Sequence, residues 1–175
     1  MTQTRYTTRS PWFERTFDFR IPACDGPEVV ERLRGTPLRV EDAVKKLSES
    51  LLVAQPDDTW SIKQNVGHLS DLESLWHTRT GQLLSGAKIL EAADVENTKT
   101  KHADHNTVSM QDLCAQFRDL RHGWVATLDS LTAEDFARTS LHPRLNQPMR
   151  LVDLCEFVAV HDDYHLARIR EIMRG

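Results

Sequence analysis

Two histidines one helical turn apart stand near the end of the chain, in the stretch HDDYH at residues 161–165. They continue the apolar spacing of residues 151–160, which is typical of a buried helix face. Residues i and i+4 are neighbours on one side of an α-helix, so His161 and His165 can direct their imidazoles at a single point. Imidazole nitrogen is a common ligand of divalent transition metals. The spacing therefore predicts a metal site that needs at least one further ligand from another element.

A third imidazole is predicted on a second helix. His68 shares a helix face with Leu72, and Gly67 beside it leaves room for a neighbouring element to approach. Three neutral imidazoles with water in the remaining position are the coordination of a catalytic metal and not of a closed structural one. The residues therefore predict that His68, His161 and His165 meet in the core of a helical bundle and hold one divalent ion.

Charged residues near these histidines are candidates for supporting roles. Asp71 and Asp162 each lie three positions from one of the histidines and could accept the second ring N–H of a metal ligand. Asp162 or Asp163 could instead act as a base on a metal-bound water. Arg168 could hold an anionic group, and Arg121 either reaches the surface along an apolar stem or binds an anion. Asp162 and Arg168 are therefore the candidate catalytic residues.

Helical periodicity dominates the chain, because glycine, proline and alternating β-branched residues are sparse. Ser61–Gln64 and Ser109–Asp112 have the spacing of capping boxes, which mark helix starts. The predicted helices are residues 27–52 with a kink or break at Gly35–Pro37, residues 61–86, residues 109–131, and the segment from Pro148 to the C-terminus. Four amphipathic helices of about 20 residues predict an all-α four-helix bundle.

The remaining segments are assigned from composition. Residues 1–24 have no helical period, and their aromatic residues predict an extended N-terminal arm packed on the bundle of residues 27–173. Residues 94–107 are polar, so a solvated loop is expected, with a lid over the site as the alternative. No linker or repeat divides the 175 residues, which predicts a single domain.

Charge and cysteine usage exclude several classes of function. The net charge is −4 without a basic block, which argues against a nucleic-acid partner. No apolar run approaches the roughly 20 residues of a membrane helix. The three cysteines are far apart and form no CxxC pair, which favours a reducing cytoplasm and places Cys114 and Cys155 in helix packing.

The stretches WSIKQNVGHL at residues 60–69 and HDDYHLARI at residues 161–169, with His142-Pro143 ahead of the last helix, together resemble the DinB/YfiT-like superfamily of metal-dependent enzymes. The resemblance implies an up-down-down-up bundle and a zinc or nickel ion on His68, His161 and His165. It also implies frequent homodimers, and relatives that include transferases and isomerases dependent on low-molecular-weight thiols such as bacillithiol and mycothiol.

The expected function is therefore that of a metal-dependent enzyme acting on a small molecule. Neither Cys114 nor Cys155 has the helical phase to serve as nucleophile at the histidines, so an attacking sulfur would come from a low-molecular-weight thiol cosubstrate. Thiol transfer to an electrophile is expected, with ester hydrolysis as the alternative. A non-catalytic metal- or small-molecule-binding bundle, or a structural protein with core histidines, are the other hypotheses.

Overall fold

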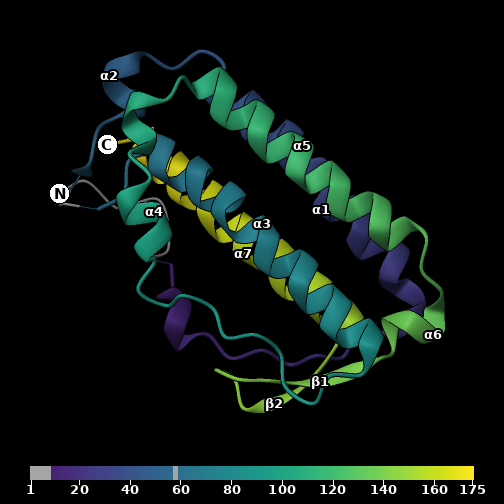
Figure 1. Ribbon diagram of the computed structural model, residues 1–175. Coiled ribbons are helices and arrows are strands. Elements are labelled where there is room, and N and C mark those ends of the chain that lie inside the picture. The colour runs from purple at the N-terminus through teal and green to yellow at the C-terminus, as the bar shows by residue number, and fades with distance from the viewer. Residues whose placement is uncertain (1–8, 57–58) are drawn as a thin grey trace, which may run out of the picture.

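Four long helices form the body of the molecule in the computed structural model, which describes residues 9–56 and 59–175. They are α1 (Gly26–Val44), α3 (Ile62–Ser85), α5 (Met110–Asp129) and α7 (Leu151–Ile172). α1 and α7 run in one direction and α3 and α5 in the other, which is the up-down-down-up order (Figure 1). α1 and α3 each pack against both α5 and α7. The predicted all-α four-helix bundle is therefore confirmed.

Local sequence signals set the ends of α3 and α5. Ser61 Oγ accepts the Gln64 N–H at 3.1 Å, and the Gln64 side chain accepts the Ser61 N–H at 2.9 Å, which completes the predicted capping box. α3 ends at Ser85, and the next residue, Gly86, has a φ of 75°, which lies in the left-handed region that favours glycine. Ser109 Oγ accepts the Asp112 N–H at 3.0 Å at the start of α5. These capping residues set the first residue of α3 and α5 and the last residue of α3.

The sequence predicts a kink or a break at Gly35–Pro37, and the break is wrong, because α1 continues through Pro37 and ends at Val44. Proline lacks the N–H that would bond the carbonyl one turn earlier, which here belongs to Leu33. The buried Arg121 of α5 donates to that carbonyl at 3.4 Å and replaces the missing partner. The chain breaks later, and α2 (Glu49–Leu52) is a separate short helix.

The apolar core runs along the bundle in two adjoining clusters. One contains Trp124 and Val158, and the other contains Phe117, Val66 and Ile169. Burial of a side chain of this size contributes roughly 1.5–3 kcal/mol. Cys114 and Cys155 are buried free thiols on α5 and α7, as predicted. The bundle therefore has a core that does not depend on a bound ion.

A layer of short elements covers the side of α3 and α7 that faces away from α1 and α5 (Figure 1). It contains η1 (Trp12–Glu14), α4 (Thr98–His102), η4 (His105–Thr107) and the antiparallel strands β1 (Thr139–His142) and β2 (Gln147–Arg150). The short helix α6 (Ala133–Phe136) precedes β1. The short helix η2 (Ala23–Asp25) precedes α1 and packs on α1 and α6. The hairpin is not predicted by the sequence pattern, which is dominated by helical periodicity. None of the described helices is both long and apolar enough to cross a membrane.

The N-terminal arm packs on α7 from residue 9 onward. The ring centroids of Trp12 and Phe17 lie 5.2 Å and 4.8 Å from that of Phe157. Phe13 is 56% exposed. The predicted packing of the arm therefore holds for most of its aromatic residues, and the part of the prediction that concerns residues 1–8 lies outside the described residues.

Candidate metal centre

The structure brings the three predicted histidines together. One possible ligand atom from each of His68, His161 and His165 lies within 4.8 Å of the others, and all three side chains are buried. His68 comes from α3, and the other two from α7. The Nε2 atoms of His161 and His165 are 3.2 Å apart.

The proton on His165 is fixed by Asn65. The Asn65 side-chain amide donates to the carbonyls of Ser61 at 2.8 Å and Trp60 at 3.3 Å, so its oxygen points to His165. An amide oxygen can only accept, so His165 Nδ1, at 2.8 Å, must carry the proton. The Nε2 atom of the neutral ring therefore directs a lone pair at the other histidines. Asn65 therefore has the role for which Asp162 was a candidate.

The proton on His68 is fixed by a chain of hydrogen bonds that ends at a carboxylate. Thr100 Oγ1 donates its only proton to Asp71 Oδ2 at 2.8 Å, so it accepts from His68 Nδ1 at 2.9 Å. His105 Nε2 lies 2.9 Å from the same Asp71 oxygen. His68 Nε2 is then left with a free lone pair. Asp71 supports His68 as predicted, but through Thr100 and not directly.

His161 is held differently. Its Nδ1 atom is buried and has no hydrogen-bond partner among the residues that the structure describes. The Trp12 ring packs edge-on against its imidazole, with the centroids 4.9 Å apart. The ring is therefore oriented by packing of the arm and by the contact of its Nε2 atom with His165 Nε2 at 3.2 Å, and not by a hydrogen bond on Nδ1.

The donor set fits a divalent ion. Ligand nitrogens about 2.0–2.1 Å from a tetrahedral zinc are about 3.4 Å from one another, close to the 3.2 Å between the Nε2 atoms of His161 and His165. Metal ligands must be unprotonated, and burial lowers the pKa of His68 to about 4. Burial also lowers the pKa of His161 and His165 well below the usual value. Three protein ligands leave at least one position free for a small molecule.

We expect the metal-free protein to lose stability as the pH falls from about 6.5 to about 4, because the unfolded chain then binds protons on histidines that stay neutral when folded. His68, with its pKa lowered from 6.5 to about 4, contributes up to about 3 kcal/mol. Burial raises the pKa of Glu73 to about 7, so protonation of Glu73 increases the stability as the pH falls. This gain comes from one group and is smaller than the summed loss from several histidines.

Urea unfolding of chelated protein at about pH 7 and about pH 4.5 measures this loss. His142→Gln should reduce it, because burial also lowers the pKa of His142 to about 4 and this residue is outside the triad. His77→Gln, at an exposed position, serves as the control. A free energy of unfolding that stays constant between the two pH values would contradict neutral, buried rings.

The triad faces a cavity of about 970 Å³ and not the centre of the bundle. The cavity is lined by the arm, α3, α7, residues 92–97 and the hairpin turn, and by no residue of α1 or α5. The sequence placed the imidazoles in the bundle core. α7 is buried on two sides, by the other helices and by the arm, so its apolar periodicity does not distinguish the two faces.

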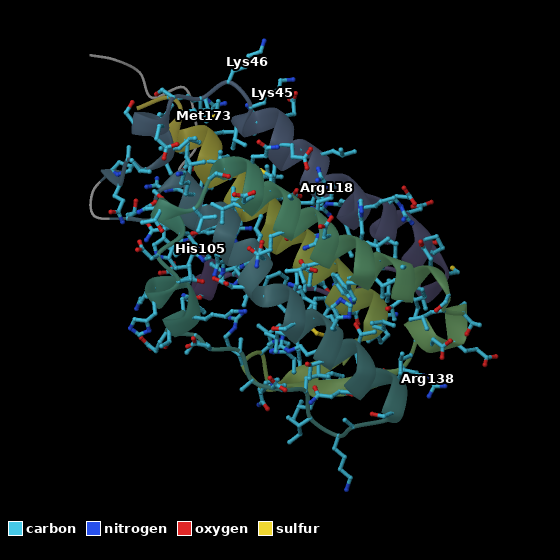
Figure 2. The ribbon with its side chains drawn as sticks, turned by 45° about the horizontal axis from the view of Figure 1, so that its top comes forward. Lys45, Lys46, His105, Arg118, Arg138 and Met173 are labelled. Carbon is cyan, nitrogen blue, oxygen red and sulfur yellow. The ribbon has the colours of Figure 1, made fainter. Side chains whose placement is uncertain are left out.

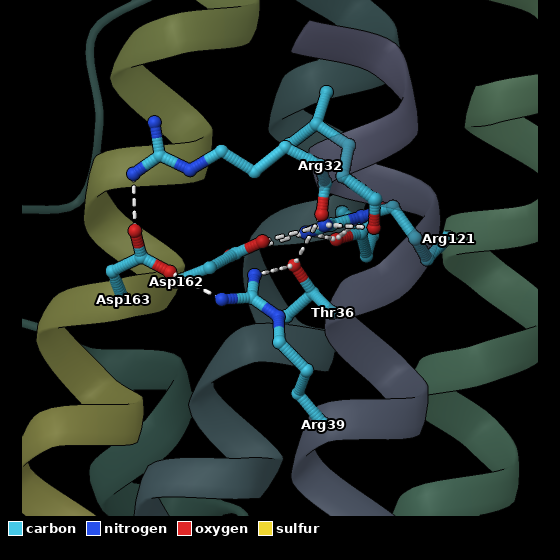
Figure 3. A network of polar contacts seen from close by, with 8 residues as sticks. Arg32, Thr36, Arg39, Arg121, Asp162 and Asp163 are labelled. Atoms are coloured by element: carbon cyan, nitrogen blue, oxygen red, sulfur yellow. Dashed lines mark hydrogen bonds and ion pairs between the residues drawn. The ribbon is translucent and has the colours of Figure 1, made fainter. Parts of the chain in front are cut away.

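Asp162 points from α7 into the bundle centre, where it meets Arg121 (Figure 3). Arg121 Nη1 donates to Asp162 Oδ2, and Arg121 Nη2 to Glu73 Oε1, each at 2.6 Å. The structure fully buries all three residues, so Arg121 neither reaches the surface nor lines the cavity. Asp163 accepts from Arg32 and Arg39 of α1 on the outer side (Figure 3). Neither aspartate is brought to the cavity.

Arg168, the other candidate, does line the cavity. Its guanidinium donates to the Thr59 hydroxyl and, at 3.2 Å, to Glu171. Glu171 also accepts two hydrogen bonds from Arg9 of the arm. Arg168 is therefore placed where it could contact a ligand, but its charge is shared with a carboxylate.

Residues 94–107 contain two short helices, α4 and η4, and are not an irregular loop, although most of these residues are exposed as their polarity predicts. Thr100 of α4 and His105 of η4 are buried against α3, and His105 is labelled beside that helix in Figure 2. Asp94, Val95 and Asn97 line the cavity, in agreement with the alternative of a cover over the site. The polar side chains of Thr100 and His105 can be buried here because they form hydrogen bonds with Asp71 and His68.

Gly67→Ala should destabilise the protein by about 1–3 kcal/mol and weaken metal binding. A Cβ atom at Gly67 would lie 2.4 Å from the His105 ring, so the ring and its bond to Asp71 must move. Loss of such outer partners typically costs 10–100-fold in metal affinity. Gly81→Ala on the same helix is the control, because nothing lies within 4 Å of its added Cβ and stability should rise by up to about 1 kcal/mol. If Gly67→Ala and Gly81→Ala changed the stability and the metal affinity equally, the role given to His105 would be contradicted.

Sequence reasoning missed Asn65 and Thr100 as partners of the histidines, although Asn65 lies inside the quoted motif. It also missed Trp12, Arg79 and Arg144 as cavity residues. Only the position of Asn65 one turn before His68 carried a usable signal. The others approach from elements whose placement depends on tertiary packing.

Known proteins share this fold and sequence pattern. "Putative metal-dependent hydrolase YfiT" of Bacillus subtilis is 25% identical over 146 residues, covering 83% of this chain and 82% of its own. "Putative metal-dependent hydrolase GK0616" of Geobacillus kaustophilus is 27% identical over 150 residues, covering 84% and 83%. The solved structure of YfiT, described as a probable metal-dependent hydrolase with an unusual four-helix bundle topology, superposes with a TM-score of 0.80 at 24% identity, over 92% of this chain and 93% of its own.

The sequence profile of the DinB superfamily matches residues 32–169. This range covers most of the chain and includes all three histidines. The chain therefore belongs to the DinB superfamily.

Proposed function

We propose that this protein is a metal-dependent hydrolase of small molecules, with zinc or nickel held by His68, His161 and His165. The observation that carries the proposal is the convergence of three buried, neutral imidazoles on one wall of a large cavity. A divalent ion in such a site activates water as a nucleophile and polarises a carbonyl or phosphoryl oxygen. The names of the relatives agree with this reaction class.

The chain supplies binding and positioning. Asn65 and Thr100 hold the rings of His165 and His68 in one tautomer, so little reorganisation is needed when a ligand enters. Trp60 and Trp76 give the cavity apolar walls that exclude water and can pack against a substrate. Among the described residues, the one carboxylate in the cavity wall is Asp94, whose side chain accepts the Thr98 N–H at 2.6 Å.

Transfer to a low-molecular-weight thiol is the second candidate, and the size of the cavity favours it. About 970 Å³ is at the upper end of ligand pockets, with room for two reactants. The chain itself provides no thiol there, because Cys114 and Cys155 do not line the cavity and burial raises the pKa of both, that of Cys114 to about 11. Sulfur would have to arrive as a cosubstrate.

The test is turnover by zinc- or nickel-loaded protein of a panel of 4-nitrophenyl carboxylic and phosphate esters, with and without low-molecular-weight thiols and a chromogenic electrophile. Hydrolysis should exceed that of His68→Ala by at least about a hundredfold, since metal activation of water is lost. His122→Ala, at an exposed position on α5, should match the wild type. Thiol-dependent turnover alone would select the second candidate, and no turnover with retained metal would indicate a binding protein.

A further inference from the structure

Two arginines lie at the hairpin end of the cavity without a carboxylate partner. Arg79 comes from α3, and Arg144 from the turn between β1 and β2. Both line the cavity, and neither forms an ion pair within residues 9–56 and 59–175. Buried cations in proteins are normally paired with an anion. Two guanidinium groups without a carboxylate partner on one cavity wall therefore offer positive charge to a bound anion.

Arg79 is almost fully buried, with 2% exposure, and its protein acceptors are neutral. Its Nε and Nη2 atoms donate to the backbone carbonyl of Glu91 at 2.9 Å and 2.8 Å. Burial lowers its pKa to about 10, while the charge of Glu91 raises the pKa and that of Arg144 lowers it by smaller amounts. The backbone carbonyl positions the guanidinium but does not neutralise it.

His142 positions Arg79. Arg79 Nη1 donates to His142 Nε2 at 3.2 Å, because a guanidinium has donors and no acceptor. The neutral imidazole therefore holds the guanidinium without neutralising its charge. A guanidinium has five N–H donors, and the bonds to Glu91 and His142 leave two of them for a ligand.

Arg144 has an unused donor as well. Its Nη2 atom is buried and has no hydrogen-bond partner among the described residues. The guanidinium is held by the rings of Phe13 and Phe157, at 5.4 Å and 6.0 Å from their centroids. Aromatic rings fix its position and leave its N–H groups free for a ligand.

We propose that Arg79 and Arg144 bind the oxyanion of the substrate, a carboxylate or a phosphate group. The proposal rests on the proposed function, because it names the substrate class of the same cavity. Guanidinium groups bind both oxyanions through paired N–H donors. The assignment is distinct from the earlier candidate Arg168, which lies at the other end of the cavity near Thr59 and Glu171.

The spacing along α3 also limits the shape of the substrate. His68 and Arg79 are eleven residues apart, or about 16 Å at 1.5 Å per residue. Leu72 and Trp76 lie between them on the same wall, and Phe157 of α7 lines the cavity too. We therefore infer an elongated anion with an apolar middle, whose oxyanion lies at the hairpin while the group to be cleaved lies at the histidines.

Binding of octanoate and of octan-1-ol to the zinc-loaded full chain, measured by calorimetry, tests this inference. The wild type should bind octanoate at least tenfold more tightly than octan-1-ol, because charge-assisted hydrogen bonds form only with the anion. Octyl phosphate in a parallel titration shows which oxyanion binds better. Arg144→Gln should remove the preference for the anion, and so should Arg79→Gln. Arg144 is only partly buried in a turn, so its variant should fold even if Arg79→Gln does not.

Two controls separate the outcomes. Arg118→Gln, on the outer face of α5 (Figure 2), should keep the preference. His68→Ala should keep it too, since the oxyanion is bound away from the triad. A preference that survives Arg144→Gln but disappears in His68→Ala would place the carboxylate on the metal and overturn the proposal, as would the absence of saturable octanoate binding. Octanoate binding that depends on Arg144 in a protein without esterase activity would instead contradict only the proposed hydrolase.

Discussion

His161→Ala should reduce the metal content of the purified protein from one divalent ion per chain to background. The variant keeps two imidazoles, and a site with two protein ligands holds zinc far more weakly than one with three. Elemental analysis of tag-free protein, after incubation with zinc at neutral pH and dialysis, measures the ion. Metal content equal to the wild type would show that His161 is not a ligand, although its Nε2 lies 3.2 Å from that of His165.

The same ion should stabilise the fold, because its ligands lie on α3 and α7, 93 residues apart in sequence for His68 and His161. An ion bound only by the folded state contributes about 2.7 kcal/mol when its free concentration is a hundred times the dissociation constant. Chelation should lower the free energy of unfolding of the wild type by about this amount and leave His161→Ala unchanged. His122→Ala, at an exposed position on α5, should respond as the wild type does.

Chelated wild type should remain folded, because both apolar clusters of the bundle lie outside the triad. Far-UV circular dichroism and a cooperative urea transition check this expectation. Complete unfolding on chelation would mean that the ion is structural. The catalytic role proposed for it would then fail, whatever the metal content of His161→Ala.

The helices were predictable because their signals are local. Ser61 with Gln64 and Ser109 with Asp112 are caps that function within one turn, and the apolar stripes of α3, α5 and α7 need no distant partner. Pro37 was misinterpreted because its effect depends on a distant residue. Arg121, far along the chain, satisfies the carbonyl that proline leaves without a donor.

The candidate site was partly predictable for the same reason. The spacing of His161 and His165 fixes their relation within one helix, whatever surrounds it. The face they occupy was not predictable, because Asp162 between them is as deeply buried as they are. Thr100 and Arg144 come from segments with no apolar period, so only the fold reveals that they reach α3 and the cavity.

Arg121→Leu should lower the free energy of unfolding by about 3–5 kcal/mol, the usual effect of removing one partner of a buried ion pair. The guanidinium contacts two carboxylates, those of Glu73 and Asp162, and the carbonyl of Leu33. Without it, two acidic groups and a carbonyl are left in the centre of the bundle, where water cannot replace the lost donors. Urea unfolding at neutral pH measures the change.

Arg118→Leu is the matched control, one helical turn earlier on α5. Arg118 forms an ion pair with Glu41 near the surface, where such a pair contributes no more than about 1 kcal/mol. A difference between the two variants of at least about 2 kcal/mol is therefore expected. If Arg121→Leu is no more destabilising than Arg118→Leu, the buried charges do not support the bundle.

A triple variant, Arg121→Leu with Glu73→Leu and Asp162→Leu, separates the pairing of the charges from their burial. Replacement of a whole buried ion network by apolar residues is often neutral or stabilising, because no charge is left without a partner. Stability should therefore return to within about 1–2 kcal/mol of the wild type. If the triple variant is as unstable as Arg121→Leu, the loss of stability comes instead from the Leu33 carbonyl. Both variants leave that carbonyl without its donor, because both lack Arg121.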